Sequence, residues 1–376
     1  TNELLGLKFY DDYSWVSAYS APVSSTMATN YTGNSSYFIT SYNTSPNYAV
    51  AVTPLYITRG MPTGAMRKVI GTVNQYLYSV DFYDDRGRTI QSQSVNYTGA
   101  IDTATVQYNF KGAVLRTLLN HKKSGNTVQN HIVLTKMDYD QAYRLRHIYK
   151  NIDNAASDQL IDSIQYNELG QVRTKYLGNL VDSMVYDYNI RGWLTGINKS
   201  YVAGTANHYF GMELGYDKTT SSAPGNTYTT PEYNGNIEGA VWKTAGSAVN
   251  RKYDYTYDNV NRLTAANFTQ YNGSGFDLSA GINFTTSNLS YDANGNILTM
   301  RQYGFMVGGS NPIDELKYTY QSNSNKLNQV YDTANNPTSL LGDFHYAGTK
   351  GSFDYAYDGN GNQVIDSNKS ISLIHY

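Results

Sequence analysis

Residues 291–297 read Tyr-Asp-Ala-Asn-Gly-Asn-Ile, so a tyrosine precedes an acidic residue, a glycine-centred turn and a β-branched residue. The same order recurs along the chain, with Asn in place of Asp in some copies. A unit repeated this often indicates one body in which each copy packs on its neighbours. The clear copies begin at Tyr83, Tyr139, Tyr166, Tyr188, Tyr257 and Tyr291, and looser copies begin at Tyr320 and Tyr357.

The residues on either side of each turn alternate between two kinds of side chain. In residues 252–257 tyrosines alternate with Lys, Asp and Thr, and in residues 172–176 Val, Thr and Tyr alternate with Arg and Lys. A period of two residues is typical of half-buried β-strands. Each copy therefore predicts a β-hairpin, and we expect the repeated tyrosines to anchor neighbouring hairpins to one another.

Glycine and asparagine supply the turn chemistry. Asn294-Gly295 and Asn360-Gly361 are expected to provide the positive φ angles that tight hairpins need. The Asp or Asn after each tyrosine can accept a hydrogen bond from the backbone two residues on, which helps to start the turn. The remaining turn glycines are Gly87, Gly170 and Gly192.

Composition favours an almost all-β chain. Of the 376 residues, 38 are Tyr, 11 are Phe and 3 are Trp, and 15 % are charged. Tyr joins a large apolar ring to a hydroxyl that needs a partner, which suits broad and partly wet sheet faces. We predict repeated hairpins that form a long, curved, spiralling antiparallel sheet. Residues 1–70 are less regular and are predicted to form a divergent N-terminal β segment, continuous with a repeat strip over residues 71–376.

Charge and cysteine content narrow the classes of partner and site. The formal charge of −2 provides no basic surface for nucleic acid or for an anionic membrane. There is no Cys, which excludes disulfides and thiol chemistry in this sequence. No apolar run approaches the roughly 18 residues of a membrane span. We therefore expect neither nucleic-acid binding nor membrane insertion.

The repeats resemble those of a known family. Tyr-Asp-x-x-Gly-Arg at 83–88, Tyr-Asp-x-x-Asn-Arg-Leu at 257–263, and Tyr-Asp-x-Asn-Gly-Asn at 291–296 resemble the Tyr-Asp repeats of rearrangement hotspot (Rhs) proteins. Residues 357–362 have the related form Tyr-Asp-Gly-Asn-Gly-Asn. The resemblance extends over residues 75–376, and the Tyr-Asn-Gly-Asn-Ile insert at 233–237 is similar to the versions found in Bacteroidota.

The resemblance implies a fold and a role. Members of this family wind their repeats into a hollow β-shell that commonly encloses a C-terminal toxin of the same polypeptide. It therefore implies a secreted or cell-surface bacterial protein whose partners are that C-terminal effector and, further, secretion machinery or a shell-closing partner. The Asp-Pro-rich core motif that follows the family's repeats is absent. We expect the chain to be a piece of a longer polymorphic-toxin-like protein, truncated before that motif.

Two turns also have the spacing of a calcium loop. Asp358-Gly-Asn-Gly-Asn362 and Asp292-Ala-Asn-Gly-Asn296 place oxygen ligands at alternate positions. Such loops also need a glycine at the sixth position and a bidentate acid at the twelfth, where the first of them has Gln363 and Lys369. A plain hairpin turn is the preferred interpretation, calcium stays the alternative, and we expect no metal and no cofactor.

Catalytic motifs are sparse. The six histidines form no i, i+4 pair and no His-Glu-x-x-His frame, so a metallohydrolase is unsupported. Paired carboxylates at Asp11-Asp12 and Asp84-Asp85 suit glycoside hydrolysis in principle, but the second pair lies inside a repeat turn. We expect no enzymatic activity.

Two functional hypotheses of different classes remain. The leading one is a structural shell segment of a secreted or surface Rhs-type protein, which encapsulates and helps to deliver a C-terminal effector. The alternative is a surface adhesin or glycan-binding module that uses exposed Tyr-rich sheet faces, since aromatic rows stack on sugars. Under either hypothesis Tyr257→Ala is expected to act through stability, by about 3–5 kcal/mol if the ring is fully buried.

Overall fold

The fold is nearly all β. It is described from a computed structural model over residues 4–306, 308–334, 342, 344–346 and 350–376. Helical segments in that part of the chain are short: α1 (Trp15–Ala18), α2 (Lys199–Val202) and the 3-10 helix η1 (Ser367–Lys369). None of them is long and apolar enough to cross a membrane. The expected fold class of repeated antiparallel hairpins is confirmed.

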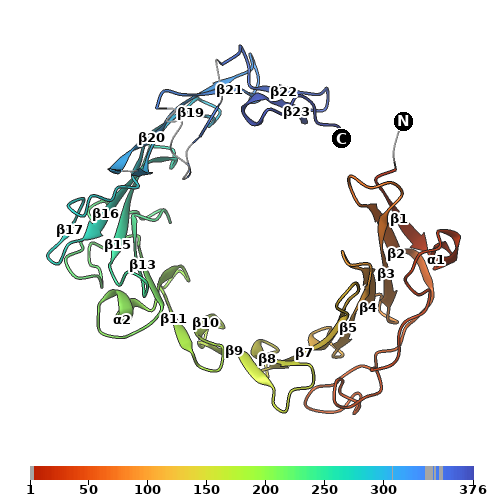
Figure 1. The fold of residues 1–376 in the computed structure, drawn as a ribbon. Helices are drawn as coiled ribbons and strands as arrows, with labels where there is room; N and C mark the ends of the chain where they lie inside the picture. Colours follow the sequence, from red (N-terminus) through yellow and green to blue (C-terminus); the bar gives the residue numbers. More distant parts are fainter. Residues whose placement is uncertain (1–3, 307, 335–341, 343, 347–349) are drawn as a thin grey trace. The chain divides into compact units, whose positions relative to one another are not determined.

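The chain divides into two compact units, Thr1–Ser183 and Met184–Tyr376. The predicted division at residue 70 lies inside the first unit and stays a prediction. In each unit strands that are consecutive in the chain lie side by side (Figure 1). Each hairpin thus packs mainly on the hairpins before and after it.

In its described residues, 4–183, the first unit contains ten complete strands. Each pairs antiparallel with the next one in the chain. The strands are β1 (Gly6–Asp11), β2 (Thr58–Lys68), β3 (Tyr76–Tyr83), β4 (Thr89–Val95), β5 (Ile101–Tyr108), β6 (Val114–Lys123), β7 (Gln129–Tyr139), β8 (Leu145–Ile152), β9 (Gln159–Tyr166) and β10 (Val172–Leu177).

The second unit continues the same pattern of antiparallel pairs. Its first strand, β11, has its first two residues in the first unit. The strands are β11 (Asp182–Tyr188), β12 (Leu194–Ile197), β13 (Phe210–Gly215), β14 (Gly239–Thr244), β15 (Arg251–Tyr257), β16 (Leu263–Tyr271), β17 (Phe276–Asp277), β18 (Thr286–Tyr291), β19 (Ile297–Met306), β20 (Gly309–Tyr320) and β21 (Leu327–Asp332). A separate pair is formed by β22 (Tyr355–Tyr357) and β23 (Gln363–Asp366).

Residues 12–57 cover one face of the first unit without forming a strand. Within the predicted N-terminal β segment, strands occur at the two ends, as β1 and β2, and between them the chain makes α1, turns and isolated bridges. This segment contributes Trp15 and Phe38 to the main apolar core, where they join Phe82 and Leu118 of the sheet. Apolar anchors at wide intervals therefore hold an irregular segment on a regular sheet.

Buried glutamines of the sheet replace the strand hydrogen bonds that residues 12–57 lack. Gln91 accepts from the backbone N–H of Ala28 and donates to its carbonyl, both at 2.8 Å. Gln107 does the same for Ile39, at 2.9 and 2.8 Å. A buried backbone group without a partner is costly, so these two side chains allow a segment without regular secondary structure to be buried.

In the second unit an insert at 216–238 covers part of the sheet. Tyr228, at its centre, is buried against Val202, Ala223 and Val241. Its ring lies over two glycines of adjacent strands, where an added methyl group would come within 2.8 Å of the ring at Gly215 and 2.9 Å at Gly239. The absence of side chains at those two positions makes the slot that receives the ring.

Candidate functional site

The repeated turn has one geometry in both units. The tyrosine pairs with the residue six positions later, and the strand register shifts immediately before it, as at Tyr257 opposite Leu263. The copy at Tyr320 differs, because its partner Leu327 lies seven positions later. Such a shift, together with a positive φ on the far side of the turn, is typical of a hairpin closed by a bulge. The turn glycines carry this angle: Gly87 has φ 72°, Gly170 82°, Gly192 79°, Gly295 88° and Gly361 90°.

The expectation for the two Asn-Gly pairs needs correction. Only the glycine of each pair has a positive φ, and Asn294 and Asn360 are not in the left-handed region. Each of these asparagines instead donates its backbone N–H, at 2.9 Å, to the carboxylate that starts its turn. One residue in the left-handed region is enough for a turn that ends in a bulge, whereas the shorter two-residue turn needs two.

The acidic residue after the tyrosine organises the turn. The Asp258 carboxylate accepts from the backbone N–H groups of Val260 and Arg262, both at 2.9 Å, and from Arg262 Nε at 2.7 Å. The backbone N–H of Arg262 is the largest of these influences, and together they hold the pKa of Asp258 below its usual value. The pKa values of Asp84, Asp140, Asp292 and Asp358 are lowered as well.

Tyrosine hydroxyls connect successive repeats. Tyr291 Oη donates to the carbonyl of Leu263, the residue six positions after the previous anchor, at 2.7 Å. We call the set of such contacts the tyrosine ladder. Its hydroxyl-to-carbonyl contacts are Tyr83 to Pro62 (2.6 Å), Tyr108 to Thr89 (2.9 Å), Tyr139 to Val114 (2.8 Å), Tyr166 to Leu145 (2.8 Å), Tyr216 to Leu194 (3.1 Å), Tyr257 to Ile237 (2.8 Å), Tyr291 to Leu263, Tyr320 to Ile297 (2.8 Å), Tyr357 to Leu327 (3.0 Å) and Tyr376 to Gln363 (2.9 Å).

The anchor rings are partly buried. Tyr83 is buried and the other predicted anchors are half-buried. Burial raises the pKa of the phenol at Tyr83, Tyr139, Tyr166, Tyr188, Tyr257, Tyr320 and Tyr357. These hydroxyls therefore stay protonated, as donors, throughout the physiological pH range.

Three members of the ladder, Tyr108, Tyr216 and Tyr376, were not predicted from the sequence. Tyr108 begins Tyr-Asn-Phe-Lys-Gly-Ala-Val114, which follows the repeat pattern and was detectable in the wide gap between Tyr83 and Tyr139. Tyr216 begins Tyr-Asp-Lys-Thr-Thr, so the Tyr-Asp pair of the repeat is present there, but no glycine turn and no second alternating run follow it. Tyr188 occupies the equivalent place at the end of β11, where it pairs with Leu194.

Cationic side chains at the end of several turns reach the next tyrosine. Arg88 lies 4.7 Å from the centroid of the Tyr108 ring, and Arg262 lies 4.7 Å from that of Tyr291. Arg262 also donates to the carbonyl of Asp292 in that next turn, at 2.9 Å. A cation over an aromatic face adds about 0.5–1 kcal/mol at exposed sites. One arginine therefore braces its own turn through Asp258 and contacts its neighbour as well.

Removing one hydroxyl of the ladder is expected to lower stability modestly. Tyr257→Phe keeps the ring and removes the 2.8 Å hydrogen bond to Ile237, so the free energy of unfolding should fall by about 1 kcal/mol. Because the ring is half-buried, Tyr257→Ala should cost about 2 kcal/mol, less than full burial would give. Urea unfolding measures both. The control is Tyr233→Phe, whose ring is 68 % exposed; an equal loss in that variant would contradict the ladder's role.

The turn carboxylates predict a specific pH dependence. Since the folded-state pKa of Asp258 is depressed, its contribution is complete above the unfolded value of about 3.9 and is lost as pH falls through the folded pKa. Asp258→Asn should lower the melting temperature at about pH 7, and the difference from the parent chain should shrink below about pH 4. The control is Asp85→Asn, in the turn at Gly87. A difference that does not change with pH would refute this assignment.

The calcium-like turns use their oxygens internally. The carboxylates of Asp292 and Asp358 each accept from two backbone N–H groups of their own turn and from one asparagine side chain. Across the described ranges no group of three or more His, Cys, Asp or Glu side chains is arranged to hold a metal ion. The carboxylate oxygens of these turns therefore serve as acceptors of the hydrogen bonds that close the hairpins.

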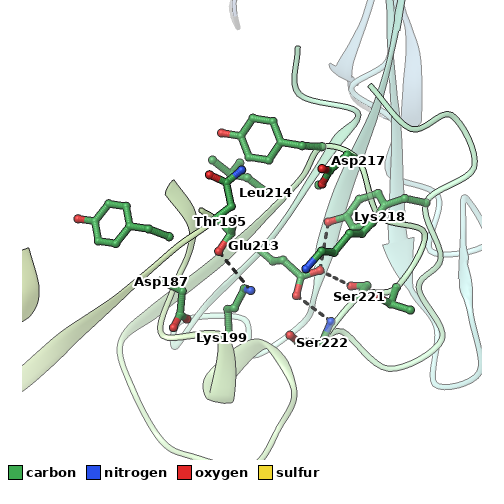
Figure 2. A pocket seen from close by; sticks show the side chains of 15 residues that line it. Asp187, Thr195, Lys199, Glu213, Leu214, Asp217, Lys218, Ser221 and Ser222 are labelled. Atoms are coloured by element: carbon green, nitrogen blue, oxygen red, sulfur yellow. Dashed lines mark hydrogen bonds between the residues drawn. The ribbon is translucent and has the colours of Figure 1, made fainter. Parts of the chain in front are cut away.

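A polar pocket of about 490 Å³ lies in the second unit, beside the start of the insert. Asp187, Gly196 and Glu213 are neighbours across β11, β12 and β13, so they share one face of the sheet. Because Gly196 has no side chain, Lys199 of α2 lies across it, and an added methyl group there would come within 2.5 Å of the lysine. Figure 2 shows Asp187 and Lys199 on one side of Glu213, and Asp217 and Lys218 on the other.

Glu213 attaches the insert to the sheet. Its buried carboxylate accepts from Ser221 Oγ at 2.5 Å, from the backbone N–H of Ser222 at 2.7 Å and from Tyr228 Oη at 3.3 Å. Burial, followed by the nearby Glu213 charge, raises the pKa of Tyr228. Both oxygens of Glu213 are thus hydrogen-bonded within the protein. The other charged side chains that line the pocket are the ones left to contact a ligand.

Comparisons with known proteins give distant structural similarity. No family model and no curated protein matches the chain. It is similar to the crystal structure of TcdB2-TccC3-TEV (TM-score 0.27, 10 % identity, 81 % of this chain and 19 % of that one) and to that of TcdB2-TccC3 without its hypervariable C-terminal region (0.27, 13 %, 71 % and 18 %). It is also similar to the Tc holotoxin pore of Photorhabdus luminescens (0.24, 13 %, 73 % and 15 %). The chain spans less than a fifth of each of these chains.

Proposed function

We propose that this chain is a structural wall segment, part of a shell that encloses a C-terminal effector of the same polypeptide. The observation that carries the proposal is the tyrosine ladder. The hydroxyl bonds of Tyr108, Tyr139 and Tyr166 each join one hairpin to the preceding one, at the residue six positions after the preceding tyrosine, so the sheet extends by adding copies. A repeat that contacts mainly its neighbours can build a wide surface without a single large core.

Features of both units suit a wall. Segments of the chain itself cover one sheet face of the first unit, through residues 12–57, and part of the sheet of the second unit, through residues 216–238. Strands paired on both sides leave few free edges, and unpaired edges are sites of aggregation. A continuous paired sheet also denies proteases the extended backbone that they need. Protection of cargo is the physical role that this architecture supports.

The proposal extends to partner and location. The effector would be held inside until delivery, and the protein would act outside the producing cell or on its surface, without itself catalysing a reaction. Secretion machinery or a partner that closes the shell would complete the system.

Protease protection tests the proposal. The natural protein, with the segment that follows the repeats, is digested with a nonspecific protease beside the same C-terminal segment expressed alone. The C-terminal segment should survive in the whole protein at protease concentrations that destroy it in isolation. Ladder variants such as Tyr291→Ala should shorten its survival, and Tyr233→Ala, in which an exposed tyrosine is lost, should leave it unchanged. Equal digestion of the enclosed and isolated segments would refute the wall role.

A further inference from the structure

The pocket beside the insert contains charged side chains that the fold itself does not use. In the part of the chain that the structure describes, the side chains of Asp187, Asp217 and Lys218 have no hydrogen-bond or ion-pair partner. Lys199 Nζ has one hydrogen bond, to Thr195 Oγ1, at a long 3.5 Å. These four groups lie around one space of about 490 Å³ (Figure 2). Asp187, Lys199 and Asp217 are half-buried and Lys218 is exposed, so their polar atoms are not used in ion pairs of the fold and are accessible to a ligand in this space.

The balance of charge restricts what that ligand can be. Glu213 is already engaged by three donors of the insert. Two carboxylates and two ammonium groups remain, so the site as a whole favours neither an anion nor a cation. Thr195, Asn189 and Ser222 add further polar groups to the lining. The pocket therefore offers donors and acceptors on all sides around an electrically balanced centre.

Hydroxyl groups match this arrangement, because a hydroxyl both donates and accepts. Several of them on one neutral molecule would donate to Asp187 and Asp217 and accept from Lys199 and Lys218, as charge-assisted hydrogen bonds. The rings of Tyr188 and Tyr216 also line the pocket and present apolar surface. The volume lies in the range of small-molecule sites.

From this geometry we propose that the pocket binds a neutral saccharide of one or two rings. The site differs from the exposed Tyr-rich strand faces considered as a glycan surface from the sequence, since its polar groups come from the sheet, α2 and the insert. The proposal is independent of the wall function. A shell that binds no sugar would pass the protease-protection test and fail the NMR test described next. A sugar-binding chain that forms no shell would give the opposite results.

Saturation-transfer NMR on the whole 376-residue chain tests the proposal. The probes are glucose, galactose, mannose, N-acetylglucosamine and lactose, with glucuronate and glycine as charged comparisons. At least one neutral sugar should receive saturation, and neither charged probe should be preferred. Asp187→Ala and Lys199→Ala should each weaken binding of that sugar about tenfold, as expected for loss of a charged hydrogen bond.

Matched variants separate binding from folding. Lys317→Ala removes an exposed lysine of β20, and it should leave binding unchanged. Asp187→Asn keeps the size of the side chain and serves if the alanine variant does not fold. No transfer to any neutral sugar would overturn the proposal, and so would stronger transfer to glucuronate or glycine. Folded Asp187 and Lys199 variants that bind the sugar as tightly as the parent chain would overturn it as well.

Discussion

Replacing Tyr228 with alanine is expected to destabilise the second unit by about 3–5 kcal/mol, the cost of removing a large aromatic ring from a closed site. Tyr228 is 2 % exposed and fills the slot over Gly215 and Gly239. Its hydroxyl donates to Glu213, so the truncation also weakens the attachment of the insert. Urea unfolding gives the magnitude. Hydrogen exchange should show the loss of protection in β13 and β14.

Two further variants make this prediction specific. Tyr233→Ala lies in the same insert with its ring 68 % exposed, and should change stability by no more than about 0.5 kcal/mol. Gly215→Ala brings a methyl group within 2.8 Å of Tyr228 ring atoms, which are the nearest atoms to it. It should therefore be less destabilising in the Tyr228→Ala background than in the parent chain. Equal stability of Tyr228→Ala and Tyr233→Ala would show that the slot contributes nothing.

Phe82→Ala is expected to have an effect of similar size in the first unit, about 3–5 kcal/mol. Phe82 is fully buried, stacks on Tyr13 with ring centroids 5.1 Å apart and contacts Tyr56 edge-on at 6.4 Å. Both partners belong to residues 12–57. Loss of the ring should therefore release that segment before the sheet unfolds.

Limited proteolysis with mass spectrometry measures this release. Cleavage of Phe82→Ala should begin within residues 12–57, at protease concentrations that leave the parent chain intact. The control in the same unit is Phe110→Ala, because Phe110 is 59 % exposed at a turn. First cleavage elsewhere in Phe82→Ala, or equal cleavage of both variants, would contradict the proposed attachment.

The repeat architecture could be predicted from sequence because its determinants are local. Alternation on both sides of a turn reports a hairpin, and the order from Tyr291 to Ile297 contains both the turn and its bulge. The tyrosine ladder was expected only as anchoring, since a sequence of alternating residues does not say which carbonyl a hydroxyl will reach. That partner follows from strand register, which places Leu263 beside the next tyrosine.

The covering segments could not be predicted, because their contacts are distant in sequence. Gln91 and Ala28 lie 63 residues apart, and nothing near either residue marks the pair. A Gln in a strand also predicts a side chain that faces solvent, whereas Gln91 is buried beneath a second layer of chain. Likewise the slot for Tyr228 depends on glycines of two strands and on the course of the insert.

The polar pocket illustrates the same limit. Asp187, Lys199 and Lys218 belong to a strand, a helix and a loop, and no motif spacing relates them. The position of Lys199 depends on Gly196, which reads as an ordinary strand residue. A site assembled in this way becomes visible only when register and packing are known.

Cryo-electron microscopy of the natural full-length protein is the most direct test of the wall function. The account predicts that these repeats form part of a closed surface, with density from the C-terminal segment on its inner side. An open strip with the C-terminal segment outside would contradict it.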